Sequence, residues 1–410
     1  MVTDGSPSDD GAPRPFVLAP FRGLRFDPAV VGDLGTVISP PYDVLDAETV
    51  RDLEAANRRN IVRLILSRRF ERPYQAVRER LLTWRKKGYL RADEEPALYL
   101  YEYTVEGAPV RGLIGLAGLR DERERVVLPH EDVMPAPVDD RAVLMRTTET
   151  NLEPILLVHE GTERLRHLVA EAAETAPLAD FTALDGSHHR LWAVTDLETL
   201  AGVAAELAGI QALIADGHHR YAAYLRLRDE HAAGGESSPW QYGLALLVDQ
   251  HDRALQIGPI HRSVAALTMS DLQEVSSERG DRFETFADRE SAMAAAASRS
   301  SAGTAWFAVS DGRAWAAIGT RRTSPVDAAV LHEALLPAWG VAEEQVGYHH
   351  SLDQALHTTA RQPGLVVAVR PPSVAEVLAA AARGQRMPRK STSFGPKPRM
   401  GMVLRDLRDA

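Results

Sequence analysis

Ile214-Ala-Asp-Gly-His-His-Arg-Tyr221 is the segment that indicates the fold of this chain most clearly. The apolar run from Ala212 to Ala215 is typical of a short buried strand, and Asp216-Gly217 interrupts it. The alanine- and leucine-rich sequence that follows predicts a helix. A carboxylate, a glycine, two imidazoles and a guanidinium therefore fall at a strand-to-helix turn.

This turn has the features of an oxyanion site. The first N–H groups of a helix have no partner within the helix, and the helix dipole favours an anion there. Arg220 adds a planar fork suited to phosphate or carboxylate. We therefore expect Asp216, Gly217, His218, His219 and Arg220 to bind phosphate. The alternative is an ordinary helix start with surface histidines, but polar density directly after a buried strand favours function.

The composition describes a globular protein of 410 residues, which suggests two or three domains or one elaborated domain. Its net charge of -10 argues against nucleic-acid binding, which usually uses a basic face. The absence of cysteine excludes disulfides, thiolate catalysis and cysteine–zinc sites. The absence of cysteine also fits a cytoplasmic protein. No run approaches the roughly 20 apolar residues of a membrane helix, so we expect no membrane contact.

Helices and strands of mixed order are expected throughout the chain, which predicts an α+β fold of mixed sheets with flanking helices. Residues 1–13 are polar and are expected to form a disordered tail. Residues 14–265 are expected to form an α+β core that carries the Asp216–Arg220 turn, and residues 266–385 a smaller α+β domain. The basic segment 386–410 is expected to return to the core. The oligomeric state does not follow from the sequence.

Several segments have a definite expected local structure. Val37 to Val44 is expected to be a strand that ends in a double-proline turn, and Asn60 to Leu66 a second strand. The polar residues between Val126 and Arg146 are expected to lie in one loop. A hairpin is expected around Asp311-Gly312, and a helix from Val374 to Ala382.

Two further polar clusters offer acids and bases. His130, Glu131, Asp140 and Arg141 are suited to hold Mg²⁺ or to exchange protons, and the alternative is a solvated acidic loop with salt bridges.

The double proline that precedes Tyr42 and Asp43 would hold these two side chains rigidly, although an ordinary turn explains the same sequence equally well.

Three groups of basic residues are candidate anion ligands. Arg63 follows Asn60 in an apolar segment, so a buried Arg63 either binds an anion or braces an internal carboxylate. His261-Arg262 repeats the pairing of imidazole and guanidinium, with a surface turn as the alternative. Lys390-Ser391-Thr392 and Lys397 are suited to cradle phosphates, although the Walker spacing is absent and a cationic tail is the alternative.

The sequence predicts no structural metal site. His188-His189, His218-His219 and His349-His350 are adjacent pairs, whereas metal-binding histidines usually lie two or four positions apart or come from distant elements.

Many separate motifs occur in an order that resembles one known family. They are Phe21-Arg-Gly-Leu-Arg25, Pro40-Pro-Tyr-Asp43, Asn60-Ile-Val-Arg63, Trp84 with Gly88-Tyr-Leu90, Pro129-His-Glu131, Asp140-Arg141, Ile214 to Tyr221, His261-Arg262 and Lys390-Ser-Thr392 with Pro396-Lys397. This set resembles the bacterial and archaeal proteins called domain of unknown function 1015, over nearly the whole chain. The tail departs slightly, because a second aromatic residue is expected near Gly395. The resemblance implies no activity.

The segment from Ile214 to Ala223 is also similar to the Asp-Gly-His-Arg box of the ParB/sulfiredoxin superfamily. The resemblance implies a ParB/sulfiredoxin-like nucleotide-binding core with large additions, in which the box holds nucleotide phosphates at a helix N-terminus. Its free serine kinase branch has the doubled His-His-Arg form. The lack of cysteine excludes sulfiredoxin chemistry, and the acidic balance and the absence of a helix-turn-helix pattern count against a partition protein.

The strand–Asp-Gly-His-His-Arg–helix pattern and this second resemblance predict a nucleotide-dependent, kinase-like phosphotransferase that acts on a small hydroxyl metabolite such as serine, or the reverse reaction that releases phosphate. The expected cofactor is ATP or ADP with Mg²⁺. The alternatives are a non-catalytic nucleotide-sensing protein and, on its basic tail alone, a nucleic-acid binder.

The expected roles of individual residues follow from phosphoryl-transfer chemistry. Glu131 or Asp43 would deprotonate the acceptor hydroxyl or hold Mg²⁺, and His219 is a further catalytic candidate. Arg63 or Lys397 would neutralise the charge that develops during transfer.

Overall fold

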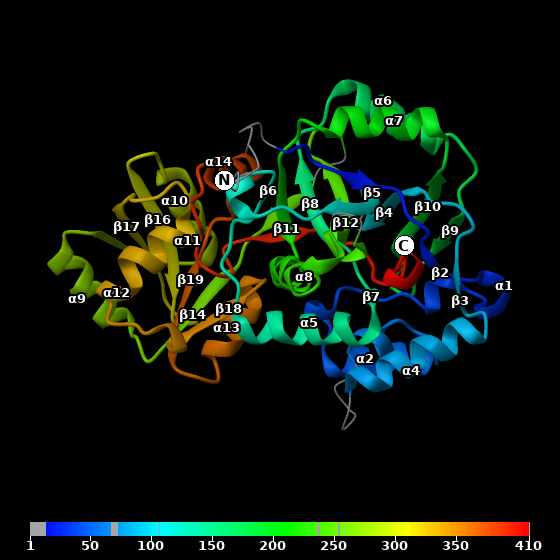
Figure 1. Ribbon diagram of the computed structural model, residues 1–410. Coiled ribbons are helices and arrows are strands. Elements are labelled where there is room, and N and C mark those ends of the chain that lie inside the picture. Colours follow the sequence, from blue (N-terminus) through cyan, green and yellow to red (C-terminus); the bar gives the residue numbers. More distant parts are fainter. Residues whose placement is uncertain (1–13, 67–72, 106, 236–237, 253–254, 410) are drawn as a thin grey trace, which may run out of the picture. The chain divides into compact units, whose positions relative to one another are not determined.

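The computed structural model describes residues 14–66, 73–105, 107–235, 238–252 and 255–409. It confirms the α+β class, with several sheets and flanking helices (Figure 1). The chain divides into two compact units: unit 1 comprises residues 1–129, 133–254 and 397–410, and unit 2 comprises residues 130–132 and 255–396. Among the described residues, no helix has both the length and the apolar character needed to cross a bilayer.

The two units differ in extent from the expected domains. Unit 2 begins at Leu255 rather than at residue 266, and it keeps residues 386–396, which were expected to return to the core. Residues 397–410 group with unit 1. The expected tail of residues 1–13 lies outside the described residues. The division into functional domains stays a prediction.

Unit 1 is built on a mixed nine-stranded sheet with the strand order β6-β11-β8-β12-β5-β4-β10-β9, in which β1 pairs with β5. The pairs β6–β11 and β8–β12 are parallel, and the other pairs are antiparallel. The strands are β1 (Leu18–Ala19), β4 (Leu98–Val105), β5 (Ala108–Gly118), β6 (Val127–Leu128), β8 (Ile155–His159), β9 (Ala179–Thr182), β10 (His188–Val194), β11 (Ala212–Asp216) and β12 (Tyr242–Asp249).

Alternate residues of these strands form the main core of unit 1, as the pleat of a strand requires. Leu98 and Leu100 on β4 and Ile155 and Leu157 on β8 belong to this core. Side chains from four helices complete it, and α5 also packs against α8. These helices are α5 (Pro135–Thr148), α6 (Glu163–Ala173), α7 (Leu197–Leu207) and α8 (His218–Glu230).

A second apolar core of unit 1 lies among its N-terminal helices and includes Met400 and Leu404 from the C-terminal segment. That segment also adds a short strand, since β21 pairs with β7. Residues from 397 onward are therefore held in the same unit as the Asp216–Arg220 turn. The elements are α1 (Pro28–Val31), α2 (Ala47–Ala56), α3 (Val62–Ile65), α4 (Pro73–Lys86), β2 (Leu24–Phe26), β3 (Leu90–Ala92), β7 (Thr150–Asn151) and β21 (Arg405–Asp406).

Unit 2 contains an antiparallel six-stranded sheet with the order β15-β17-β16-β19-β14-β18, and a separate β13–β20 pair. The expected hairpin around Asp311-Gly312 and the helix from Val374 to Ala382 are confirmed. The elements are β13 (Gln256–Gly258), β14 (His261–Ala265), β15 (Arg282–Phe286), β16 (Thr304–Ser310), β17 (Trp315–Arg321), β18 (Val346–His349), β19 (Gly364–Ala368), β20 (Ser393–Gly395), α9 (Met269–Arg279), α10 (Arg289–Arg299), α11 (Asp327–Val330), α12 (Leu336–Ala338), α13 (Leu352–Thr359) and α14 (Val374–Ala382).

Two of the expected strands are wrong. Val37 to Val44 forms no strand: Ser39 makes one bridge to Met400, and Tyr42–Val44 is a 3₁₀ turn. The two prolines carry no N–H group to donate to a sheet, which explains the difference. Val62–Ile65 is the helical turn α3 rather than a strand, and three of its four residues are buried. A short apolar run does not distinguish a buried helical turn from a strand.

The expected polar loop between Val126 and Arg146 is also wrong over its second half. Pro135–Thr148 forms α5, which begins with proline in its first turn. Proline suits that position because the N–H it lacks has no helical partner there. Asp140 and Arg141 therefore lie on a helix rather than in a loop.

The central strand β12 tests this description of unit 1. Leu246 on β12 is fully buried, so Leu246→Ala is expected to lower the free energy of unfolding of unit 1 by about 2–5 kcal/mol. The matched control is Leu197→Ala on α7, where the leucine is 82% exposed and a change of about 0.5 kcal/mol or less is expected. Urea denaturation, followed by hydrogen exchange of unit 1 peptides, measures both. Equal effects of the two variants would contradict the burial of Leu246 on β12.

Candidate functional site

The turn between β11 and α8 depends on Gly217. Its φ of +96° lies in the left-handed region, which glycine adopts without strain. A Cβ atom at this position would lie 2.9 Å from Cγ2 of Ile155 and 3.1 Å from Nε of Arg220. Gly217 has no side chain to accept a hydrogen bond from the first N–H groups of α8. The positive end of the helix dipole, which lies directly after Asp216, is therefore not capped by a side chain.

Asp216 joins two cations at this turn. Nζ of Lys397 donates to Oδ1 of Asp216 over 2.6 Å, and Nη2 of Arg220 donates to Oδ2 over 2.6 Å. Burial raises the pKa of Asp216, but Lys397 and Arg220 together outweigh it and hold that pKa below its usual value. Asp216 is therefore ionised at neutral pH.

Arg220 is buried and engaged on several sides. Its Nη1 donates to the carbonyl oxygen of Pro154 and lies 3.6 Å from Oε2 of Glu153. Burial lowers the pKa of Arg220, whereas Glu153 and Asp216 raise it above the usual value. Its Nε is buried and makes no hydrogen bond to any described residue. Arg220, expected as a phosphate ligand, is thus in this structure an internal brace.

Glu153 extends these contacts to α5. Its Oε1 lies 3.8 Å from Nη1 of Arg141, and Nη2 of Arg141 donates to Asp140 over 2.7 Å. The hydroxyl of Tyr74 donates to the other oxygen of Asp140 over 2.5 Å. We call Lys397, Asp216, Arg220, Glu153, Arg141 and Asp140 the charged chain. It holds three cations and three anions, so its formal charge is zero.

Tyr42 lies beside the charged chain. Its ring centroid is 5.0 Å from the guanidinium carbon of Arg141, and burial raises the pKa of its hydroxyl. The backbone of Asp43, the next residue, belongs to the same 3₁₀ turn. The Asp43 side chain, an expected base, lies outside what the structure describes.

The two histidines of the turn open α8. Nε2 of His219 accepts a hydrogen bond from the backbone N–H of Met134 over 3.1 Å, one residue before α5 begins. His218, like His219, is half-buried. His219 therefore links the turn to the start of α5. Its expected catalytic role stays a prediction.

Asn60 and Arg63 have structural partners in unit 1. The amide of Asn60 donates to the carbonyls of Thr36 and Ile38, and its oxygen accepts from the N–H of Val62. Nη2 of Arg63 donates to the carbonyl of Glu54 over 3.1 Å. Nη1 of Arg63 also lies 3.9 Å from Oε1 of Glu54. Both roles weighed for Arg63, bracing a carboxylate and binding an anion, stay predictions.

A second cluster of expected site residues lies in unit 2. Oε1 of Glu131 accepts hydrogen bonds from the N–H groups of Ser391 and Thr392, each over 3.2 Å, and from the Thr392 hydroxyl over 3.0 Å. Nε2 of His130 lies 2.8 Å from the same hydroxyl. Burial raises the pKa of Glu131, although these hydrogen bonds oppose the shift. Glu131 thus holds the turn after Lys390.

Arg262 supports that turn from β14. It is fully buried, and it donates to the carbonyl of Lys390 over 2.9 Å and to Nε2 of His332 over 2.9 Å. Burial lowers its pKa to about 10. Arg262 thus positions Lys390, whose φ of +58° needs such support. Its expected role in binding phosphate stays a prediction.

The expected site residues are divided between the two units. Unit 1 holds Tyr42, Asp43, Asn60, Arg63, Asp140, Arg141, Asp216, Gly217, His218, His219, Arg220 and Lys397. Unit 2 holds His130, Glu131, His261, Arg262, Lys390, Ser391 and Thr392.

Sequence reasoning missed Glu153, the carboxylate between Arg141 and Arg220. Glu153-Pro154 directly precedes the buried strand β8, and that position was the available signal. No three Asp, Glu or His side chains among the described residues are grouped to hold a metal ion.

Replacement of Gly217 tests the turn. Gly217→Ala is expected to destabilise unit 1 by about 1–3 kcal/mol, because alanine is strained at this φ and its Cβ would press on Ile155. Gly209→Ala is the control, since a Cβ there meets no atom within 4 Å. Chemical denaturation of both variants measures the difference. An unchanged stability of Gly217→Ala would contradict the turn geometry.

The pKa of Asp216 gives a pH prediction. An unfolded aspartate titrates near about 3.9, and the folded pKa is lower, so Asp216 stabilises the fold above that pH and ceases to do so as the pH falls through the folded value. Lys397→Met removes one cation and raises the folded pKa toward the unfolded value, so the stability lost on acidification should be smaller and the loss should be complete at a higher pH. Unfolding free energies between pH 2.5 and 6 measure this, with exposed Lys86→Met as control. Parallel curves for the variant and the wild type would exclude the Lys397–Asp216 pair.

Three solved structures are similar to part of this chain. The conserved hypothetical protein from Pyrococcus furiosus is 15% identical, with 73% of this chain and 96% of that chain covered and a TM-score of 0.38. The free serine kinase in complex with AMP is 14% identical, with 71% and 91% covered and a TM-score of 0.38. SbnI with C-terminal truncation from Staphylococcus aureus is 12% identical, with 72% and 87% covered and a TM-score of 0.35. Similarity at these TM-scores assigns neither an activity nor a ligand to this chain.

Family membership rests on sequence. A search of curated proteins finds no match. The family described as protein of unknown function (DUF1015) matches residues 18–340, which is more than half of the chain and includes the Asp216–Arg220 turn. The chain therefore belongs to the DUF1015 family.

Proposed function

We propose that the protein is a nucleotide-dependent phosphotransferase that moves a phosphoryl group between ATP or ADP and a small hydroxyl metabolite such as serine. The phosphates would lie at the N-terminus of α8, against Gly217, His218 and His219. Lys397 would supply the mobile positive charge, and Arg220 would hold the turn in shape.

The observation that carries this proposal is the pairing of Lys397 with Asp216 directly before the N-terminus of α8. Lys397 makes its described ion pair through one Asp216 oxygen, and its side chain is 16% exposed. An ammonium group on a flexible stem can turn to a phosphate oxygen while Asp216 keeps Arg220. Lysine is also rare in this chain. Of the 47 lysine and arginine residues, the lysines are Lys86, Lys87, Lys390 and Lys397.

The chemical step needs a base, and Asp43 is our first choice. It belongs to the same unit as the turn and follows Tyr42, which packs on Arg141 of the charged chain. In transfer from ATP, the acceptor oxygen bonds to the γ-phosphorus, the bond from that phosphorus to the bridging oxygen breaks, ADP leaves, and the hydroxyl proton passes to the carboxylate.

Magnesium would enter with the nucleotide rather than occupy a protein cage. The described residues offer no cluster of three acidic or imidazole ligands, and Asp140, Glu153 and Asp216 are each close to a cation. Mg²⁺ commonly binds through substrate phosphates and one or two carboxylates, which is compatible with this arrangement.

Calorimetric titration of the full chain with AMP, ADP and ATP, with and without Mg²⁺, tests the binding step. Lys397→Met is expected to weaken nucleotide binding about tenfold or more, because a charge-assisted hydrogen bond to phosphate is lost. Lys86→Met, which removes an exposed charge elsewhere in unit 1, should bind like the wild type. Failure of the wild type to bind any of the three nucleotides would overturn the proposal.

Phosphorus NMR of ATP or ADP mixed with serine and related hydroxyl compounds tests transfer in both directions. Asp43→Asn is expected to abolish turnover and keep binding, whereas Glu131→Gln should retain turnover. The opposite result would move the base to Glu131.

A non-catalytic nucleotide sensor is the second candidate. It is favoured by the neutral charged chain and by Glu131, which is already held by Ser391 and Thr392. Binding without turnover of any hydroxyl compound would support it.

A further inference from the structure

A cavity of about 460 Å³ lies within unit 2, and Glu131 is not among the residues that line it. Its volume is within the range typical of small-molecule sites. Apolar side chains, among them Met293, Trp306 and Leu352, form much of its lining, and His261 and Arg289 are among its polar residues. An apolar lining with few polar groups is the usual composition of a metabolite pocket.

Short side chains leave this cavity open. Ala296 and Ala297 face it from α10, Ala308 from β16 and Ala368 from β19. Ala296, Ala308 and Ala368 are buried, so larger side chains at these three positions would narrow the pocket.

His261 lines this space and carries a ring nitrogen that can donate a hydrogen bond. The residue is 6% exposed and lines the cavity, and its Nδ1 accepts the backbone N–H of Val369 over 3.2 Å. Burial, with Arg262 and Arg289, lowers its pKa to about 4, so the ring is neutral at pH 7. The single ring proton then lies on Nε2, for which no described residue supplies a hydrogen-bond partner.

The charged groups of the cavity are cationic. Arg289 and Arg370 line it, whereas none of the described residues that line it is acidic. Arg289 pairs with Asp353 over 2.7 Å, with side chains 47% and 71% exposed. Exposed pairs contribute little to stability, so a ligand carboxylate can replace Asp353 at small cost. Arg370 contacts Glu376 over 3.3 Å and Asp327 over 3.5 Å.

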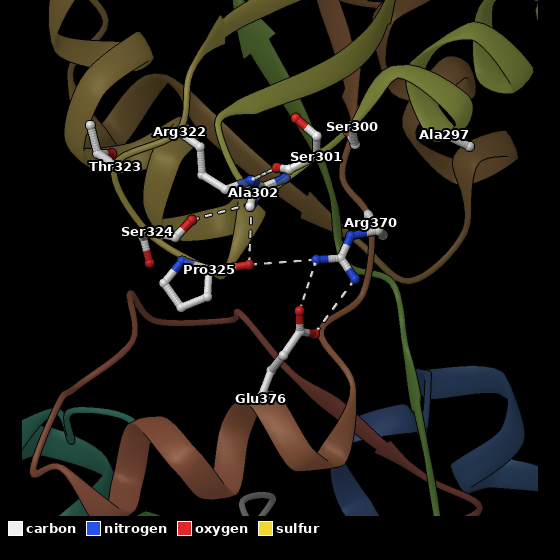
Figure 2. Close-up of a pocket in the computed structure, with 10 residues that line it drawn as sticks. All are labelled: Ala297, Ser300, Ser301, Ala302, Arg322, Thr323, Ser324, Pro325, Arg370 and Glu376. Atoms are coloured by element: carbon white, nitrogen blue, oxygen red, sulfur yellow. Dashed lines mark hydrogen bonds and ion pairs between the residues drawn. The ribbon is translucent and has the colours of Figure 1, made fainter.

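A larger hollow of about 720 Å³ in the same unit is less suited to a ligand (Figure 2). Its Arg322 donates to the carbonyl of Ser301 and to Asp327, each over 2.7 Å. Figure 2 shows Arg370 turned toward Glu376 and the Pro325 carbonyl. Arg322, which lines this hollow and not the 460 Å³ cavity, is thus held in a buried ion pair with Asp327, whereas the pair of Arg289 with Asp353 is exposed.

We propose that the 460 Å³ cavity binds a small carboxylic acid with an apolar aryl or alkyl body. The body would lie against Trp306 and Met293, and the carboxylate would accept from Nε2–H of His261 and from Arg289. This site is separate from the phosphate site of unit 1 and does not depend on it.

Ligand-observed NMR titration of the full chain tests the pocket with phenylacetate, indole-3-acetate and hexanoate. We expect saturable binding of at least one acid, about tenfold tighter than 2-phenylethanol or 2-phenylethylamine, because only the carboxylate pairs with Arg289. Ala297→Leu should abolish binding by filling the cavity, and Ala294→Leu on the same helix should not. Arg289→Gln should weaken binding at least fivefold, whereas exposed Arg282→Gln, outside the cavity, should not.

Lys397→Met is expected to leave acid binding unchanged, which separates this inference from the proposed nucleotide site. The absence of saturable binding for all three acids would overturn it. Equal affinity for the alcohol, insensitivity to Ala297→Leu, or binding of phosphate or AMP that is lost in Arg289→Gln would also overturn it.

Discussion

The buried guanidinium of Arg220 is the interaction on which the unit 1 site depends. It joins the end of β11 through Asp216 to the residues that lead into β8 through Pro154 and Glu153. Removal of one partner from a buried ion pair typically costs about 3–5 kcal/mol, because a charge is left without compensation. Gly217 is required beside it, since a Cβ atom there would press on the guanidinium. A rigid, electrically neutral support thus underlies the first turn of α8.

This arrangement divides the cations of the site into fixed and movable ones. Arg220 and Arg141 are buried and contact several groups each, so neither can turn to a ligand without breaking the support. Lys397 lies on the C-terminal segment and contacts Asp216 through an ammonium group on a flexible stem. In the proposed function, a phosphate at the helix would replace the contact between Lys397 and Asp216 and leave the contacts among Asp216, Arg220 and Glu153 in place. Preorganised charge of this kind is how phosphate sites limit the cost of reorganisation.

The sequence predicted the central elements because their patterns were local. The strand, glycine and helix around Asp216-Gly217 and the hairpin around Asp311-Gly312 are both present. Asn60 to Leu66 was misassigned, because a buried helical turn and a strand have the same apolar composition. The role of Glu153 was not predictable, since its partners Arg141 and Arg220 come from separate helices. The guanidinium of Arg220 was expected to face a ligand, but only tertiary contacts could reveal that it faces inward.

The backbone amides of His218 and His219, at the start of α8, report most directly on the proposed phosphate site. Full-length protein labelled with ¹⁵N in histidine only, and assigned through His218→Gln and His219→Gln, would be titrated with pyrophosphate and then with ADP. If phosphate binds this helix terminus, the backbone amide resonances of His218 and His219 move saturably, and those of His188 and His251 elsewhere in unit 1 do not. Unmoved His218 and His219 resonances at saturating ligand would contradict a phosphate site at this turn.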